Sequence, residues 1–137
     1  NADFDEGWER IKSQGDIEEL VSKDQLRVAS KEVGEFTRGK TLYREKQFIL
    51  NEKGKLIQGV IDLLAVDGDR CVIVDYKTSS PKTIASGEYD LQLAVYARAA
   101  SRILGLKVEK SVIYSFESGE FTQFSENDYD LDSVLCD

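Results

Sequence analysis

Two acids and a lysine stand where the sequence could carry out chemistry. Asp75 and Lys77 interrupt the apolar run 71–77, and Asp62 lies thirteen residues before Asp75. Because a strand alternates its facing every two residues, Asp75 and Lys77 should project from one side and Tyr76 from the other. An ionised group is costly to bury unless it is paired or coordinates a metal. The pattern therefore predicts a salt bridge, a bound cation, or both.

The turn between the two acids predicts how they face each other. Strands are expected at 56–66 and 71–77, with a turn signal at 67–69 between them. If Gly68 and Asp69 form a two-residue loop, Asp62 and Asp75 are directly opposed, with Cβ atoms about 4.5–5.5 Å apart. A loop of different length would place them on a diagonal. Two close carboxylates repel each other, and a divalent cation relieves that repulsion.

The chemistry follows from the ligand type. Hard oxygen ligands select Mg²⁺ or Mn²⁺. Such an ion lowers the pKa of a bound water and stabilises charge on a phosphate. Lys77 would position or deprotonate that water, or offset charge on the phosphate, and both roles stay open.

Helices and further strands must hold these residues in place. Apolar spacing predicts helices in the first forty residues, where the last runs from Lys23 to about residue 37, and a helix from 86 or 87 to Leu104. A polar loop containing Pro81 precedes that helix. The remaining strands are expected at 42–50, 108–116 and 120–124. We predict an α/β fold with a central mixed five-stranded sheet, built from a three-strand antiparallel meander, a helix and two further strands, and flanked by helices.

Composition fits one domain of 137 residues: a helical part at 1–40, a catalytic core at 41–124 and an acidic tail at 125–137. The chain contains no histidine, which excludes histidine-based catalysis and histidine-ligated zinc. No apolar run approaches a membrane helix, and the placement of Cys71 and Cys136 argues against a disulfide, so a cytoplasmic location is expected. The start without methionine suggests an excised fragment.

Charge is unevenly distributed along the chain. The net charge is −4 over residues 1–30, +2 over 31–82 and −6 over 83–137, for a total of −8. The segment with the Asp75 and Lys77 pair is the only one that is not acidic, which is compatible with a local phosphate contact. DNA affinity rises with the number of phosphates neutralised, so this chain alone should bind DNA weakly.

Asp62 on the second strand of a meander, with Asp75 and Lys77 on the third, forms the pattern of the PD-(D/E)XK nuclease superfamily. Over residues 40–116 the chain resembles one branch of it, the nuclease domain at the C-terminus of RecB and AddA helicase-nucleases. The segments that carry this resemblance are Glu45-Lys46-Gln47-Phe48, Gly59-Val60-Ile61-Asp62, Asp75-Tyr76-Lys77-Thr78 and Gln92-Leu93-Ala94-Val95-Tyr96.

The resemblance implies a restriction-endonuclease-like core and assigns roles to residues. Asp62, Asp75 and the main-chain carbonyl of Tyr76 would be metal ligands, and Lys77 would be catalytic. Three further residues would contact DNA or support the site: Gln92, Tyr96 and Glu45. The implied function is Mg²⁺- or Mn²⁺-dependent exonucleolytic DNA hydrolysis in recombinational DNA repair. The implied partners are DNA, the helicase portion of a longer chain and a partner subunit, with the isolated domain monomeric.

One departure from the branch keeps alternatives open. Its members carry a histidine ligand on a helix before the first strand, and this chain has none. Either the histidine lies upstream of Asn1, or water or a carboxylate such as Glu32 or Glu35 replaces it. Loss of a ligand would favour a catalytically impaired nuclease-fold module that binds DNA or serves assembly. A third possibility is a stand-alone restriction-type nuclease, which would act as a dimer.

Overall fold

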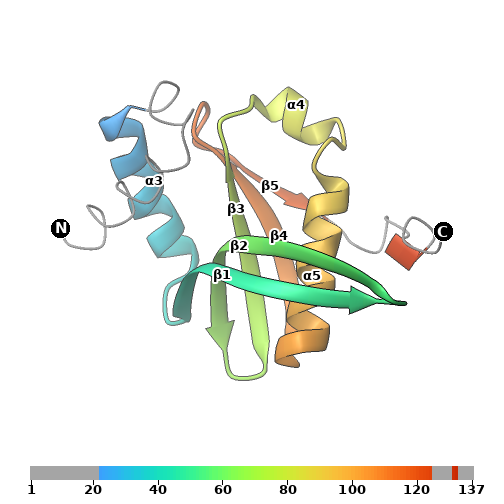
Figure 1. Cartoon of the computed structure of the whole chain (residues 1–137). Coiled ribbons are helices and arrows are strands. Elements are labelled where there is room, and N and C mark those ends of the chain that lie inside the picture. The colour runs from blue at the N-terminus through green and yellow to red at the C-terminus, as the bar shows by residue number, and fades with distance from the viewer. Residues whose placement is uncertain (1–21, 125–130, 133–137) are drawn as a thin grey trace.

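A five-stranded mixed sheet forms the centre of the protein (Figure 1). The structure, a computed structural model, describes residues 22–124 and 131–132. The strands lie in the order β1-β2-β3-β4-β5, and only β3 and β4 pair in parallel. Their bounds are β1 (Thr41–Glu52), β2 (Lys55–Asp67), β3 (Arg70–Lys77), β4 (Lys107–Ser115) and β5 (Phe121–Phe124). The predicted meander and mixed sheet are confirmed.

Helices α3 (Lys23–Phe36) and α5 (Asp90–Leu104) contribute to separate apolar clusters on the two faces of the sheet. Ser22 begins α3 with a capping box, in which its Oγ accepts from the Gln25 N–H and the Gln25 side chain accepts from the Ser22 N–H. Gly105, at φ 67°, ends α5 in the left-handed conformation that glycine adopts without strain. The sheet is therefore covered on both sides, as its nearly continuous apolar strands require.

The segment around Pro81 differs from the prediction. It forms a short helix, α4 (Pro81–Ala85), where a polar loop was expected, and α5 begins at Asp90 rather than at 86 or 87. Proline suits the first helical turn because its missing N–H would have no partner there, and the Ser80 side chain caps that turn. Gly87, at φ 94°, separates the two helices.

The two faces of β3 contact different helices. Cys71 and Ile73 pack in the cluster that contains α5, whereas Val72 and Val74 pack in the cluster that contains α3. Five residues of this strand, 71 to 75, are buried. The expected helices before residue 22 lie outside the described residues, as does most of the acidic tail. The division into domains stays a prediction.

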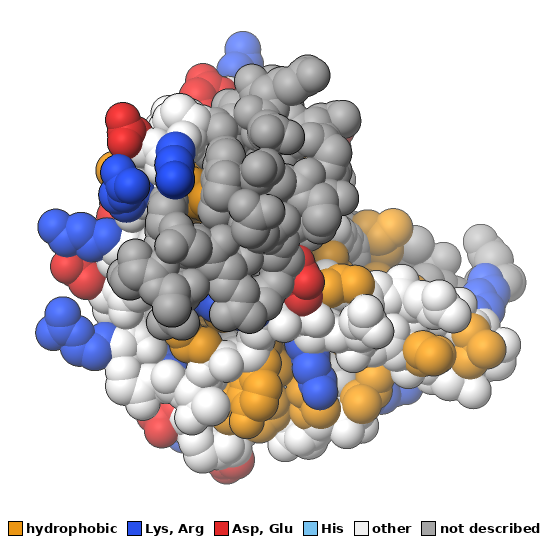
Figure 2. All heavy atoms as spheres, turned by 60° about the vertical axis from the view of Figure 1, so that its left-hand side comes forward, with side chains coloured by type: hydrophobic (Ala, Val, Ile, Leu, Met, Phe, Trp, Pro, Cys, Tyr) orange, Lys and Arg blue, Asp and Glu red, His pale blue; other side chains and the backbone are white. Residues whose placement is uncertain are grey.

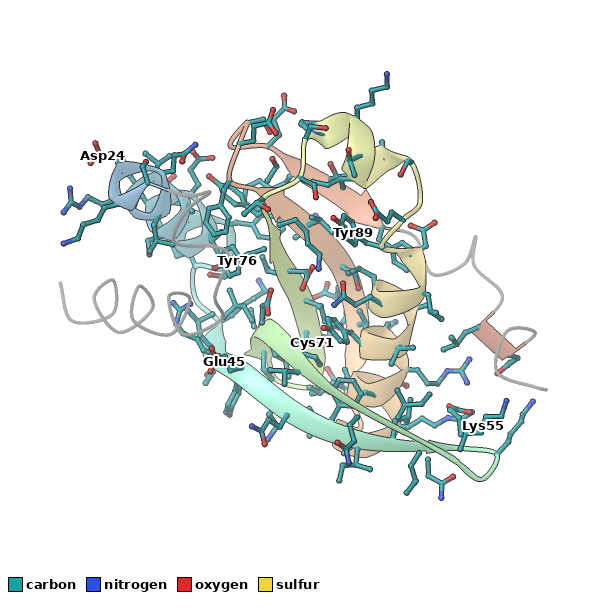
Figure 3. All side chains as sticks on the ribbon, turned by 45° about the horizontal axis from the view of Figure 1, so that its top comes forward. Asp24, Glu45, Lys55, Cys71, Tyr76 and Tyr89 are labelled. Carbon is teal, nitrogen blue, oxygen red and sulfur yellow. The ribbon has the colours of Figure 1, made fainter. Side chains whose placement is uncertain are left out.

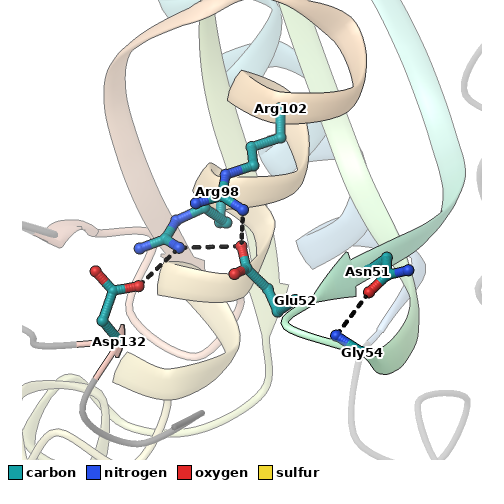
Figure 4. A network of polar contacts seen from close by, with 6 residues as sticks. All are labelled: Asn51, Glu52, Gly54, Arg98, Arg102 and Asp132. Carbon is teal, nitrogen blue, oxygen red and sulfur yellow. Dashed lines mark hydrogen bonds and ion pairs between the residues drawn. The ribbon is translucent and has the colours of Figure 1, made fainter.

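The β1–β2 hairpin forms a long arm that is tied to α5 near its tip (Figure 4). Glu52, only 1% exposed, accepts contacts of 3.0 Å from Nη1 of both Arg98 and Arg102, and Arg98 also lies 3.0 Å from Asp132. The turn itself is closed by the Gly54 N–H, which donates to Asn51 Oδ1. A buried carboxylate that loses its cationic partners costs about 3–5 kcal/mol, so these ion pairs fix the arm on the helix.

The outer side of the arm is apolar in part. Figure 2 shows apolar side chains gathered along one side of the molecule, and the exposed ones on these two strands include Tyr43, Ile49 and Leu56. Among the described residues, no helix is long and apolar enough to cross a membrane.

Candidate active site

Three acidic residues occupy neighbouring positions across the first three strands. The β2–β3 register pairs Leu63 with Val74, as a two-residue Gly68-Asp69 loop requires, so the next position places Asp62 opposite Asp75. On the other side, β1 pairs Arg44 with Leu63 and Lys46 with Ile61, which places Glu45 opposite Asp62. The predicted hairpin register is confirmed.

The backbone changes course at this point of the sheet. Glu45 has φ 50°, a left-handed conformation that non-glycine residues adopt at a cost of about 1–3 kcal/mol. Ile61 packs in the α5 cluster and Leu63 in the α3 cluster, although residues two apart on a regular strand share a face. The alternation of facing therefore breaks beside Asp62, at the position opposite the strained residue.

Asp62 and Asp75 are buried together. Asp75 is 1% exposed, and Asp62 Oδ2 accepts a hydrogen bond of 3.0 Å from the Tyr76 main-chain N–H. Burial, followed by the charge of Asp75, raises the pKa of Asp62 to about 8, against the lowering influence of the Tyr76 N–H and of Lys77. Two carboxylates in this environment resist carrying two negative charges without a cation.

Lys77 supplies one positive charge. Its Nζ lies 3.1 Å from Asp75 Oδ2, yet Oδ2 makes no hydrogen bond and is itself shielded from solvent. The contact is thus a charge pair that leaves a buried carboxylate oxygen with unused acceptor capacity. An oxygen of that kind is a ready ligand for a hard cation.

A chain of hydrogen bonds extends from Lys77 to α5. Lys77 Nζ donates to Gln92 Oε1 at 2.8 Å, and Gln92 Nε2 donates to the Tyr96 hydroxyl at 2.9 Å. Gln92 and Tyr96 are four residues apart, so they share a helix face. Burial, with smaller contributions from Asp75 and Asp62, raises the pKa of Tyr96 to about 12, so its hydroxyl stays protonated. The pair that was predicted to lie beside the site does lie beside it.

Tyr76 presents only its main chain to the acids. Its ring contributes to the α3 cluster and stacks on Phe116 at 5.5 Å between centroids. Burial raises the pKa of its phenol. Figure 3 shows the labelled Tyr76 side chain near α3, apart from the labelled Tyr89 across β3. A role for Tyr76 through its carbonyl is compatible with this arrangement, whereas a role for its hydroxyl at the acids is not.

The donor set suits a divalent cation of the hard class. Asp62, the unsatisfied oxygen of Asp75 and the Tyr76 carbonyl would hold the ion, with water completing its coordination as Mg²⁺ prefers. Within the described part of the chain, no three or more acids, cysteines or histidines are grouped as a metal site. Glu32 does not join the pair: it lies on α3, with Oε1 close to Gly119. No described contact brings Glu35 to the pair either.

Sequence reasoning missed Tyr89 and Ser79. Tyr89 was expected in the core, and Ser79 in a flexible polar loop. In the structure the Tyr89 ring centroid lies 4.5 Å from Lys77 Nζ, and its hydroxyl lies 2.5 Å from Ser79 Oγ. The spacing of Tyr89, Gln92 and Tyr96, which puts all three on one face of a helix, was the signal that could have found Tyr89.

This site and fold agree with comparisons to known proteins. Residues 1–134 match the family described as the PD-(D/E)XK nuclease superfamily, and the chain belongs to that superfamily. The expected restriction-endonuclease-like core is thereby confirmed. A structure titled "Crystal structure of SSO0001" aligns with 93% of this chain and 80% of its own, at 18% identity and a TM-score of 0.45.

Curated relatives narrow the branch. An ATP-dependent helicase/nuclease of the AddA type from Pelotomaculum thermopropionicum is 45% identical over 69 residues, which cover 47% of this chain and 5% of that protein. The protein of the same name from Alkaliphilus metalliredigens is 29% identical over 143 residues, covering 80% of this chain and 12% of the relative. The resemblance to RecB and AddA nuclease domains is confirmed. The chain spans only a small part of these relatives, and family and relatives together support a nuclease role.

Proposed function

We propose that this chain is a Mg²⁺- or Mn²⁺-dependent deoxyribonuclease domain that hydrolyses DNA phosphodiester bonds by attack of water. The observation that carries the proposal is the placement of Lys77 Nζ between a buried carboxylate, at 3.1 Å from Asp75 Oδ2, and Gln92 Oε1, at 2.8 Å. An ammonium held in this way has a fixed position beside two carboxylates that resist joint ionisation. That combination fits phosphate chemistry better than a structural ion pair does.

Each residue receives a role from its contacts. Asp62, Asp75 and the Tyr76 carbonyl hold the cation, which when bound stabilises charge on the phosphate and lowers the pKa of the attacking water. Lys77 orients the water or offsets charge that develops on the phosphate.

Gln92 and Tyr96 act from α5. Gln92 keeps Lys77 in place through the 2.8 Å hydrogen bond, and the Tyr96 hydroxyl fixes the Gln92 amide. Their exposed edges would contact DNA. Glu45, opposite Asp62 in the register, supports the acids.

The wider setting follows the relatives. We place the chain in a cytoplasmic helicase-exonuclease that processes DNA in recombinational repair, where the helicase portion and a partner subunit deliver the strand. The net charge of −8 supports such dependence, because a domain that neutralises few phosphates binds DNA weakly by itself. The isolated domain would be a monomer.

Cleavage of linear and circular DNA tests the proposal. The chain should degrade end-labelled linear DNA with Mg²⁺ or Mn²⁺, spare covalently closed circles as an exonuclease does, and lose activity in EDTA. Asp75→Asn and Lys77→Ala should each lower kcat at least about a hundredfold. Asp67→Asn, which removes an exposed carboxylate from the same hairpin, is the matched control and should leave kcat unchanged.

Manganese binding provides a second, independent measurement. Calorimetry should detect Mn²⁺ binding to the wild-type chain and none to Asp62→Asn. DNA binding without cleavage or Mn²⁺ binding, in the chain and in a longer protein that contains it, would replace the proposal with a non-catalytic module. Cleavage that persists at the wild-type rate in Lys77→Ala would remove the lysine from the mechanism.

A further inference from the structure

The Lys77 ammonium is surrounded on three sides by different elements. Asp75, on the same strand, lies 3.1 Å away, and Gln92 of α5 accepts a hydrogen bond of 2.8 Å. The third neighbour is the ring of Tyr89, whose centroid lies 4.5 Å from Nζ. A lysine side chain has about 2 kcal/mol of rotamer entropy, so a fixed ammonium requires such contacts. The Lys77 side chain is 20% exposed, so water covers little of it.

Tyr89 is itself held by the strands that end beside it. It stands at the N-cap position of α5, but its side chain makes no capping hydrogen bond. Its hydroxyl instead lies 2.5 Å from Ser79 Oγ, just after β3. Ser115, at the end of β4 and 1% exposed, donates from Oγ to the Ser79 carbonyl at 2.9 Å. The ring is therefore anchored to the same sheet edge that carries Lys77.

We propose that Tyr89 is a positioning residue that fixes the Lys77 ammonium through its ring face, and this inference rests on the hydrolytic function proposed above. The ring attracts the cation electrostatically and leaves the hydrogen-bonding capacity of the ammonium free for Gln92 and for the reacting groups. The ring thus selects one lysine conformation without competing for its donors. The hydroxyl has a separate task, which is to hold the ring against Ser79.

Substitutions at residue 89 separate the ring from the hydroxyl. Tyr89→Leu removes the ring and should lower kcat about tenfold with little change in KM, because the ring acts on the lysine and not on DNA. Tyr89→Phe keeps the ring and should retain kcat within about threefold. Phenylalanines with one, two and three fluorine atoms at residue 89 should lower kcat progressively, because fluorination weakens the negative face of the ring. Lys77→Ala gives the reference for complete loss of the lysine.

A purely structural ring predicts something different. If Tyr89 only fills space, the fluorinated series should have the kcat of Tyr89→Phe, and that result would overturn the inference. A kcat for Tyr89→Leu equal to that of wild type would overturn it as well. Thermal unfolding midpoints of the fluorinated variants should match that of Tyr89→Phe, which ties any loss of kcat to ring electrostatics.

A spectroscopic measurement tests the placement even if the chain cleaves no DNA. In the wild-type protein and in Tyr89→Phe, the ε-methylene protons of Lys77 should be shifted upfield by the ring, and in Tyr89→Leu that shift should disappear. Lys77 is identified as the resonance missing from the spectrum of Lys77→Ala. An upfield shift without cleavage would refute the nuclease proposal and keep the positioning role. Cleavage that depends on Lys77 without an upfield shift would refute the positioning role alone.

Discussion

Replacing Asp62 by asparagine should stabilise the metal-free protein at neutral and alkaline pH while it destroys the metal site. The pKa of Asp62 is raised to about 8 in the folded protein, from 3.8 in a free carboxyl group, chiefly by burial and then by Asp75. A raised folded-state pKa means that the folded protein binds this proton more tightly than the unfolded chain. The contribution of Asp62 is therefore fully present below about pH 4 and is lost as the pH rises through about 8.

The magnitude follows from the window between the two pKa values. One pKa unit corresponds to about 1.4 kcal/mol, so the full shift sets an upper bound of ~6 kcal/mol. Asp75 shares the charge of the pair and water reaches part of the site, so we expect a smaller effect of ~2–4 kcal/mol between pH 4 and pH 8. Asparagine retains an oxygen for the Tyr76 N–H and carries no charge at any pH.

Urea unfolding in EDTA over this pH range measures the effect. The unfolding free energy of Asp62→Asn minus that of wild type should be near zero at pH 4 and should rise to ~2–4 kcal/mol at pH 8. Asp67→Asn, an exposed site on the same strand, is the control and should show no such trend. Saturating Mn²⁺ should stabilise wild type and leave Asp62→Asn unchanged. A difference between the variants that does not vary with pH would refute the reasoning.

Three further substitutions test the framework around the site. Glu52→Gln should lower the unfolding free energy by ~3 kcal/mol in urea titrations, because two arginines lose a buried charge partner, whereas the exposed Glu120→Gln should change it little. Gly59→Ala should cost ~1–3 kcal/mol, since its Cβ would lie 2.5 Å from the Phe48 ring, while Gly34→Ala in α3 has open space and should gain up to ~1 kcal/mol; equal unfolding midpoints for the two would contradict this. Tyr96→Phe should lower kcat about threefold to tenfold by leaving the Gln92 amide without its acceptor, and an unchanged kcat would separate Tyr96 from the site.

The sequence predicted the parts of the site that depend on periodicity and turn geometry. Gly68 and Asp69 set the register, so the opposition of Asp62 and Asp75 follows from counting residues on either side of the turn. The left-handed conformation of Glu45 could not be predicted in this way, because no local residue type demands it and the strain depends on the surrounding sheet. Tyr89 was missed because an aromatic residue at helical spacing usually packs in a core, and its contact with Lys77 depends on where the α4–α5 turn lies.

The same strand that builds the core also fixes the geometry of the site. Residues 71 to 74 of β3 are held on both faces, by the α5 cluster and by the α3 cluster, so the strand cannot shift to relieve the charges that follow it. Asp75 therefore keeps an oxygen without a hydrogen bond, and Lys77 remains beside it instead of turning to water. Groups that are already in place need no reorganisation during a reaction, which is the main advantage of a site in a rigid sheet over one on a loop. The buried oxygen of Asp75 and the raised pKa of Asp62 are then two consequences of one arrangement, a cation site held open by the core.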